Sequence, residues 1–170
     1  MGLKEHGNQF IVRAALADGL ADRLLQTFQQ ELHRLSARKL DMSGDTVSFA
    51  GGSFRFVSNW NLLVPISRGK IVVMPIADGV TVRYQISFRE LIVVATIMIL
   101  AMAVIFCGFE GRAGLASVAF FVPVGWLWLV GMNIVIAIPR FNSFVKRCAK
   151  MAGATEIHQI AEPAAVRYGS

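Results

Sequence analysis

The stretch LIVVATIMILAMAVIFCGF, residues 91–109, decides the fold of this chain. It is 19 residues long and holds no charged side chain. As an α-helix it would measure about 28 Å, which matches a bilayer hydrocarbon core of about 30 Å. Leu, Ile, Val and Phe dominate the stretch, and each favours insertion by roughly 0.3–0.6 kcal/mol near the bilayer centre. We therefore predict a transmembrane helix over 91–109.

A second apolar stretch, AGLASVAFFVPVGWLWLVGMNIVIAI, covers residues 113–138. Only the connector 110–112 separates the two stretches, so the two helices must run antiparallel and touch. The second stretch is longer than one crossing needs, and we expect it to tilt or to kink at Pro123. Residues 91–138 are thus predicted to form a transmembrane hairpin.

The composition of the whole chain supports this assignment. Hydrophobic residues make up 55% of the 170 residues, charged residues only 16%, and the mean hydropathy is +0.54. Soluble domains carry roughly 25% charged residues, so the numbers argue against both disorder and a wholly soluble protein. The net charge of +6 is typical of a membrane protein with basic cytoplasmic segments. Because no stretch combines clustered Lys/Arg with stacking aromatics, we expect no nucleic-acid partner.

The charges beside the hairpin predict its orientation. The connector carries one cation, Arg112. The flanking segments carry several, namely Arg83, Arg89, Arg140, Lys146, Arg147 and Lys150. By the positive-inside rule, both termini lie in the cytoplasm and the connector lies outside. The predicted location is therefore a cytoplasmic or inner membrane.

Residues 139–152 show the spacing of a short amphipathic helix. Apolar side chains recur at Phe141, Phe144, Val145, Cys148 and Met151, while the cations lie mostly off that stripe. One interpretation places the helix on the inner membrane surface, with Arg89, Arg140, Lys146, Arg147 and Lys150 near anionic headgroups. The other packs the same stripe onto the soluble domain. Residues 153–170 are predicted to be a frayed tail.

Residues 1–90 are predicted to form one cytoplasmic α+β domain. A strand is expected near 10–16. A helix should follow from a cap at Asp18 to about Arg38, because Leu side chains and Phe28 recur along one of its faces. A strand and a helix followed by several strands are typical of a helix laid on an antiparallel sheet.

The rest of this domain alternates with a period of two. The pattern runs through 46–49, a Gly51-Gly52 turn and 54–56, followed by an apolar run over 62–66 and a strand over 70–76. Asp78-Gly79 is the strongest hairpin signal and favours a type I′ turn. After it, 80–88 alternates without a break. The sequence thus predicts an antiparallel meander of about four strands that leads directly into the first membrane helix.

No catalytic or metal-binding pattern is present. His6, His33 and His158 share no ligand spacing, and no serine lies in a G-x-S-x-G elbow. In the predicted topology Cys107 and Cys148 lie at opposite faces of the bilayer, so they cannot pair. We therefore expect no enzyme activity, no cofactor and no metal site.

A few polar and aromatic residues are candidate anchors for a partner or an interface. Asn59, Trp60 and Asn61 interrupt the strand pattern, and the structural explanation is a bulge or corner. Asn133 is the one strongly polar side chain in the second apolar stretch, and a hydrogen bond within the hairpin would explain it. Trp126 and Trp128 lie too deep for an aromatic belt and would pack on the first helix or on a partner.

The leading hypothesis for function is a non-catalytic binding or accessory domain held against the inner membrane face. Its partners would be the bilayer and either another membrane protein or further copies of the chain. One alternative is binding of lipid or another apolar ligand in an aromatic pocket lined by Phe49, Phe54, Phe56, Tyr84 and Phe88. Another is an oligomeric pore built from hairpins. Because neither stretch contains an ionisable residue, a proton-coupled transporter is not favoured.

Overall fold

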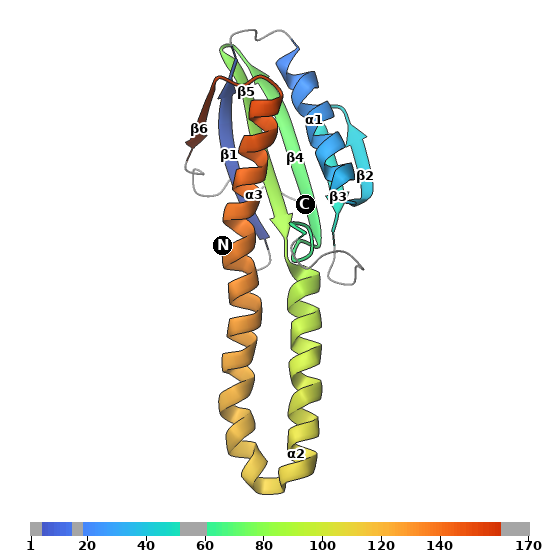
Figure 1. Cartoon of the computed structure of the whole chain (residues 1–170), viewed down its shortest axis with the longest axis vertical. Coiled ribbons are helices and arrows are strands. Elements are labelled where there is room, and N and C mark those ends of the chain that lie inside the picture. The colour runs from blue at the N-terminus through green and yellow to red at the C-terminus, as the bar shows by residue number, and fades with distance from the viewer. Residues whose placement is uncertain (1–4, 15–18, 52–60, 161–170) are drawn as a thin grey trace, which may run out of the picture.

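The computed structural model describes residues 5–14, 19–51 and 61–160, without the side chains of Glu5 and 109–117. Within these ranges the chain forms a six-stranded antiparallel sheet that is extended at one end by a long helical hairpin (Figure 1). The fold class is therefore α+β, as predicted. The elements are β1 (Glu5–Arg13), α1 (Leu20–Arg34), β2 (Arg38–Ser43), β3 (Thr46–Ala50), β4 (Arg68–Ile76), β5 (Gly79–Ser87), α2 (Arg89–Trp126), the π-helical turn η1 (Leu127–Gly131), α3 (Met132–Met151) and β6 (Glu156–Ile160).

The sheet has the strand order β2-β3-β4-β5-β1-β6. Strands β2 to β5 form a four-stranded meander, as the sequence predicts, although its members differ from the expected ones. β2 comes from residues 38–43, where the sequence predicts no strand, while the apolar run over 62–66 lies in the connection before β4 and is not a strand. Gly52, Phe54 and Phe56 lie outside the described residues. The apolar character of this run has a structural reason, since Leu63 and Ile66 are fully buried in the core of the sheet domain.

Helix α1 buries the face that its sequence predicts. Leu20, Leu24, Phe28 and Leu32 are fully buried. The helix ends at Arg34 and not near Arg38, because Ser36 takes a left-handed φ of 59° and its amide bonds the His33 carbonyl at 2.8 Å. Asp18, the predicted cap, lies outside the described residues, and Gly19 occupies the N-cap position.

The β4–β5 hairpin is present, but its turn is shifted by one residue from the prediction. Ile76 pairs with Gly79, so Ala77 and Asp78 form the two-residue loop. Among the described residues other than glycine, only Ser36 and Lys39 have positive φ. The turn is therefore not type I′, which needs positive φ at both loop residues. Beyond it, the alternate residues from Val80 to Phe88 are buried as predicted.

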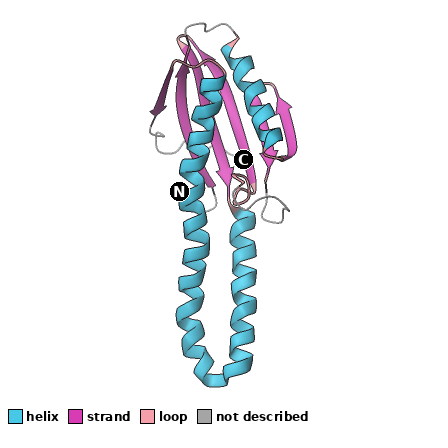
Figure 2. Ribbon diagram, in the orientation of Figure 1, coloured by secondary structure: helices cyan, strands magenta, loops and turns pink. Residues whose placement is uncertain are grey.

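The second half of α3 belongs to the core of the sheet domain. Helices α1 and α3 lie side by side over one face of the sheet (Figure 2). Phe141 is fully buried, with its ring centroid 4.8 Å from that of Tyr84 and 6.1 Å from that of Phe49. Of the two interpretations of residues 139–152, the helix packed on the domain is the one observed. Four residues of its apolar stripe, Phe141, Phe144, Val145 and Cys148, are buried in the domain core, and Met151 at the end of the helix is exposed.

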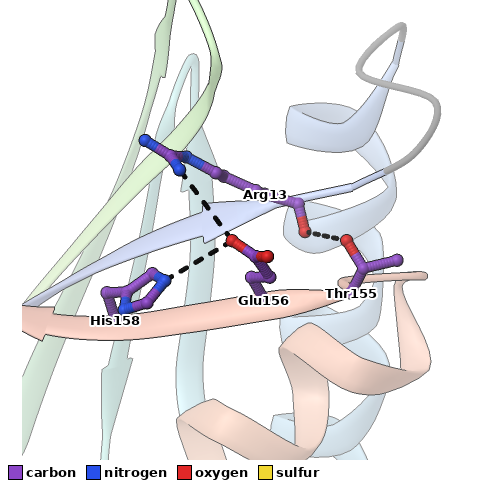
Figure 3. A network of polar contacts seen from close by, with 4 residues as sticks. All are labelled: Arg13, Thr155, Glu156 and His158. Carbon is purple, nitrogen blue, oxygen red and sulfur yellow. Dashed lines mark hydrogen bonds and ion pairs between the residues drawn. The ribbon is translucent and has the colours of Figure 1, made fainter.

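The predicted frayed tail over 153–170 contains a strand, β6, over Glu156–Ile160. β6 pairs antiparallel with β1, from Gln9 opposite Ile160 to Arg13 opposite Glu156. The Thr155 amide bonds the Arg13 carbonyl at 2.9 Å, and the Thr155 hydroxyl donates to the same carbonyl at 3.2 Å. Glu156 Oε2 lies 3.8 Å from Arg13 Nη1 and 3.5 Å from His158 Nε2 (Figure 3). The prediction failed because the ladder is formed by backbone groups, which leave no pattern in a short exposed sequence. Residues 161–170 lie outside the described residues.

The hairpin projects from the end of the sheet where β5 stops (Figure 1). Two helical segments, Arg89–Gly108 and Val118–Met151, are long and apolar enough to cross a membrane, and the second of them continues into the domain core. The chain reverses between them, since Trp126 Nε1 donates to Thr96 Oγ1 at 2.9 Å. Pro123, where the sequence predicts a kink, lies inside α2, and the irregular turn nearby is the π-helical η1, which begins four residues later.

Candidate functional site

A groove lies where the sheet domain meets the hairpin. We call it the basic groove. It has a volume of about 1070 Å³ and is open on one side. Its charged lining consists of four cations, Arg38, Arg68, Lys70 and Arg89, and one acid, Glu90.

The floor of the basic groove is the sheet face opposite α1 and α3. The strand register aligns its side chains in two rows. In one row Ser48, Lys70 and Gln85 are neighbours across β3, β4 and β5. Asp41 continues this row on the edge strand β2, but it does not line the groove. The row therefore contributes Lys70 as its only charge within the groove lining.

The other row carries two arginines. Arg38, Ala50, Arg68 and Ser87 follow one another across β2, β3, β4 and β5. Arg38 and Arg68 are two strand spacings apart, or about 10 Å. Ala50 lies between them and is too small to fill the gap. Two guanidinium groups can therefore approach one anion from opposite sides.

The wall of the basic groove is the start of α2. Arg89, Val93 and Ile97 repeat every four residues along it, and so do Glu90, Val94 and Met98, so both stripes face the groove. Ser67 Oγ accepts from the Glu90 amide at 2.6 Å, and this bond fixes the start of the helix against the sheet. The wall is polar at its first turn and apolar from its second turn onward.

The cations of the groove are free to bind an anion. Within the described parts of the chain, none of Arg38, Arg68, Lys70 and Arg89 makes a side-chain ion pair or hydrogen bond. By contrast, Arg34 and Arg147 both contact Glu31. Unpaired guanidinium groups are the side chains best suited to bind phosphate, because they present a planar pair of donors.

The predicted aromatic pocket is a filled core wherever it is described. Phe49, Tyr84 and Phe88 are all almost completely buried. The space beside them is filled by Phe141 and Phe144 of α3, a helix for which the sequence left two positions open, on the membrane surface or on the domain. Phe54 and Phe56 lie outside the described residues. The structure therefore brings these aromatics together for packing.

Tyr84 is a titratable group buried in this core. Its hydroxyl bonds Asn142 Oδ1 at 2.5 Å, and Asn8 Nδ2 donates to the same oxygen at 3.3 Å. Burial raises the pKa of Tyr84 to about 12, against an ordinary value of 10.0, and a hydrogen bond from Asn8 partly offsets this shift. The polar cluster thus ties β1, β5 and α3 together around a neutral phenol.

The raised pKa of Tyr84 predicts a loss of stability at high pH. The folded state holds the phenol proton more tightly than the unfolded state, so stability is full below pH 10 and falls as the pH rises toward 12. We expect a loss of roughly 2 kcal/mol over that window. Chemical unfolding at graded pH would measure it. Tyr84→Phe should remove this component of the slope, and an equal slope in both proteins would contradict the prediction.

The remaining candidate anchors make internal contacts where they are described. Trp126 bonds Thr96 across the hairpin, and Asn133 Nδ2, at the start of α3, donates to the Leu129 carbonyl of the π-helical turn at 2.7 Å. Asn61 bonds the Leu35 carbonyl and accepts from the Leu63 amide, both at 2.9 Å. Trp128 and Asn133 are exposed, whereas Trp126 and Asn61 are half-buried. Asn59 and Trp60 lie outside the described residues.

The cations of α3 lie at increasing distances from the hairpin. Each turn of a continuous α-helix adds 5.4 Å along its axis, so residues in successive turns cannot all lie at one membrane surface. Arg140 lies next to the hairpin, whereas Lys150 lies in the last turn at the far end. Lys146 lies 5.7 Å from the Phe10 ring centroid, and Arg147 pairs with Glu31 at 3.7 Å. Of the five cations predicted at the membrane surface, only Arg89 lines the basic groove.

Sequence reasoning missed Arg38, Arg68 and Lys70. The alternation of β4 does place Arg68 and Lys70 on one face, opposite the buried Ile71 and Val73. Their proximity to Arg38 and Arg89, however, depends on strand register and on where α2 begins. Comparisons with models of protein families, with curated proteins and with solved structures find no match to this chain.

Proposed function

We propose that this chain is a two-pass integral membrane protein. Its hairpin would anchor the sheet domain against the cytoplasmic face of the membrane, and the domain would act as a non-catalytic binding module there. The observation that carries this proposal is the way the hairpin joins the domain. Two chain segments enter the core without a linker, so the hairpin can fix the orientation of the domain.

The first of these junctions is β5 to α2. Only Phe88 separates the two elements, and it is buried in the core. The second is α3, which is one uninterrupted helix. It contributes Ala137 and Phe141 to the core and continues into the hairpin on its other side. A domain held at two points cannot swing freely, which suits a module that acts at a fixed height above a bilayer.

The surface of the hairpin supports its insertion in lipid. Large apolar side chains such as Val104, Phe121 and Leu127 are mostly exposed along both segments. A contiguous apolar surface of this kind needs lipid or protein to cover it. The excess of cations on the domain side over Arg112 in the connector supports a cytoplasmic domain.

Membrane insertion is tested by extraction. We expect the full chain to stay in the membrane pellet after treatment with alkaline carbonate. Val104→Arg should shift it toward the supernatant, because an arginine inside the span opposes insertion, by up to about 2.5–3.5 kcal/mol at the helix centre. Val104→Leu is the matched control and should behave like the parent. Complete release of the parent protein by carbonate would overturn the proposal.

Orientation is tested by labelling a single cysteine. Cys148 is fully buried, so Cys107→Ala leaves a background without an accessible thiol. Asp45→Cys in the exposed β2–β3 turn then reports on the domain. A membrane-impermeant maleimide should label it in inside-out vesicles and not in right-side-out vesicles. The reverse pattern would place the domain outside.

The binding role is tested by purification from native membranes in mild detergent. We expect the chain to retain a partner protein or to self-associate. Recovery of the bare chain alone would count against an accessory role. Flux of ions through reconstituted liposomes would favour the alternative of a pore built from hairpins.

A further inference from the structure

We propose that the basic groove binds one anionic phospholipid. Its phosphate would lie among Arg38, Arg68, Lys70 and Arg89, and an acyl chain would follow the apolar wall of α2. This inference rests on the proposed membrane insertion and names a ligand for the surface where the domain meets the bilayer.

The charge of the groove selects an anion. Four cations and one acid line it, and among the described residues none of the cations has an ionic partner. Arg38 and Arg68 flank Ala50 on neighbouring strands, so a phosphate above Ala50 can accept from both. Lys70 adds a third cation from the adjacent row of the sheet.

The apolar wall selects a lipid over a soluble anion. Arg89 begins α2, and Val93 and Ile97 follow it at one and two turns on the same helix face. From Arg89 to Ile97 the helix rises about 12 Å. A ligand held at Arg89 by its charge therefore meets only apolar side chains further along the helix. A phospholipid has a charged headgroup followed by apolar acyl chains and so matches this wall, whereas a free phosphate has no apolar part.

The direction of the wall fits a bilayer lipid. The segment Arg89–Gly108 is the first of the two membrane-length segments, so the apolar wall of the groove is also the lipid-facing surface of that segment. The cations then lie at the level of the headgroups and the apolar wall at the level of the acyl chains. The groove volume of about 1070 Å³ is large enough for a headgroup and the first part of a chain.

The test measures retention of a lipid by the full chain. The protein is purified in detergent and titrated with phosphatidylglycerol or with neutral phosphatidylcholine, and native mass spectrometry counts the bound lipids. We expect one phosphatidylglycerol to bind in preference to phosphatidylcholine. Arg68→Gln/Arg89→Gln should weaken this binding by about fivefold for each cation removed, or about twenty-five-fold in total.

The control removes the same charge elsewhere. Arg34→Gln/Lys150→Gln changes two cations that lie outside the groove, and it should retain binding within about twofold. Equal losses in both double variants would mean that net charge alone attracts the lipid, and the inference would be wrong. Thermal unfolding of the variants shows whether they are folded. If Arg68→Gln/Arg89→Gln fails to fold, the single variant Arg38→Gln on the edge strand tests the same groove.

Two further outcomes are informative. Displacement of phosphatidylglycerol by excess inorganic phosphate would show a plain anion site and would overturn the assignment to lipid. A chain that resists carbonate but shows no preference for phosphatidylglycerol would overturn this inference alone. Release of the chain by carbonate would instead overturn the proposed membrane insertion.

Discussion

Replacing Phe141 with alanine should lower the unfolding free energy of the sheet domain by about 3–5 kcal/mol. Phe141 is 0% exposed and lies against Phe49, Tyr84 and Phe144. Removing its ring leaves a cavity at the point where α3 meets the sheet. Aromatic pairs add roughly 0.5–1.5 kcal/mol beyond burial, and three such pairs are lost together.

This prediction can be measured by chemical unfolding in detergent, followed by near-ultraviolet circular dichroism. Phe121→Ala is the matched control, because Phe121 lies on the hairpin and is 67% exposed. It should leave the stability of the domain unchanged. If Phe141→Ala also leaves it unchanged and instead weakens membrane association, then this part of α3 lies on the membrane surface and its packing is wrong.

Replacing Gly79 with alanine should destabilise the domain by about 3 kcal/mol or more, because backbone strain and overlap add. Gly79 has φ +152°, in a region that is nearly restricted to glycine. An added Cβ would also overlap the backbone carbonyl oxygen of Val12 on the neighbouring strand. Neither group can move without opening the pairing of β1 with β5, since Val12 and Val80 are register partners.

The control for Gly79 separates strain from overlap. Gly44, in the β2–β3 turn, also has a positive φ, at +53°, but an added Cβ there meets nothing within 4 Å. Gly44→Ala should therefore cost only about 1 kcal/mol of backbone strain. Thermal unfolding of both variants under the same conditions would compare them. Similar losses at the two positions would mean that contact with Val12 does not constrain the turn.

The hydrophobic pattern of a single segment was sufficient to predict which face of that segment is buried. The burial of Leu20, Leu24 and Phe28 along α1 follows from a helical repeat. The burial of alternate residues from Val80 onward in β5 follows from a strand repeat. Both signals depend only on neighbouring residues, and the side-chain period fixes them. The predicted position of the β4–β5 turn was wrong by one residue, because the pairing of Ile76 with Gly79 sets the loop and depends on the register of the two strands.

Long-range pairing was not accessible from the sequence. The edge strand β6 is short and mostly exposed, so backbone bonds to β1 define it, with little pattern in its side chains. The basic groove has the same origin. Arg38 and Arg68 lie 30 positions apart in the chain and meet only because β2, β3 and β4 pair in one register.

The amino-acid sequence by itself determined the two membrane-length apolar segments, the mixed helix and strand content, and the faces that α1 and β5 bury. Each of these depends on hydrophobic periodicity within a single element. Tertiary structure alone decided that the end of α3 completes the domain core, that β6 closes one edge of the sheet, and that four cations gather beside α2. Those features depend on which backbone groups and surfaces meet across distant segments, and side-chain periodicity carries no information about such partners.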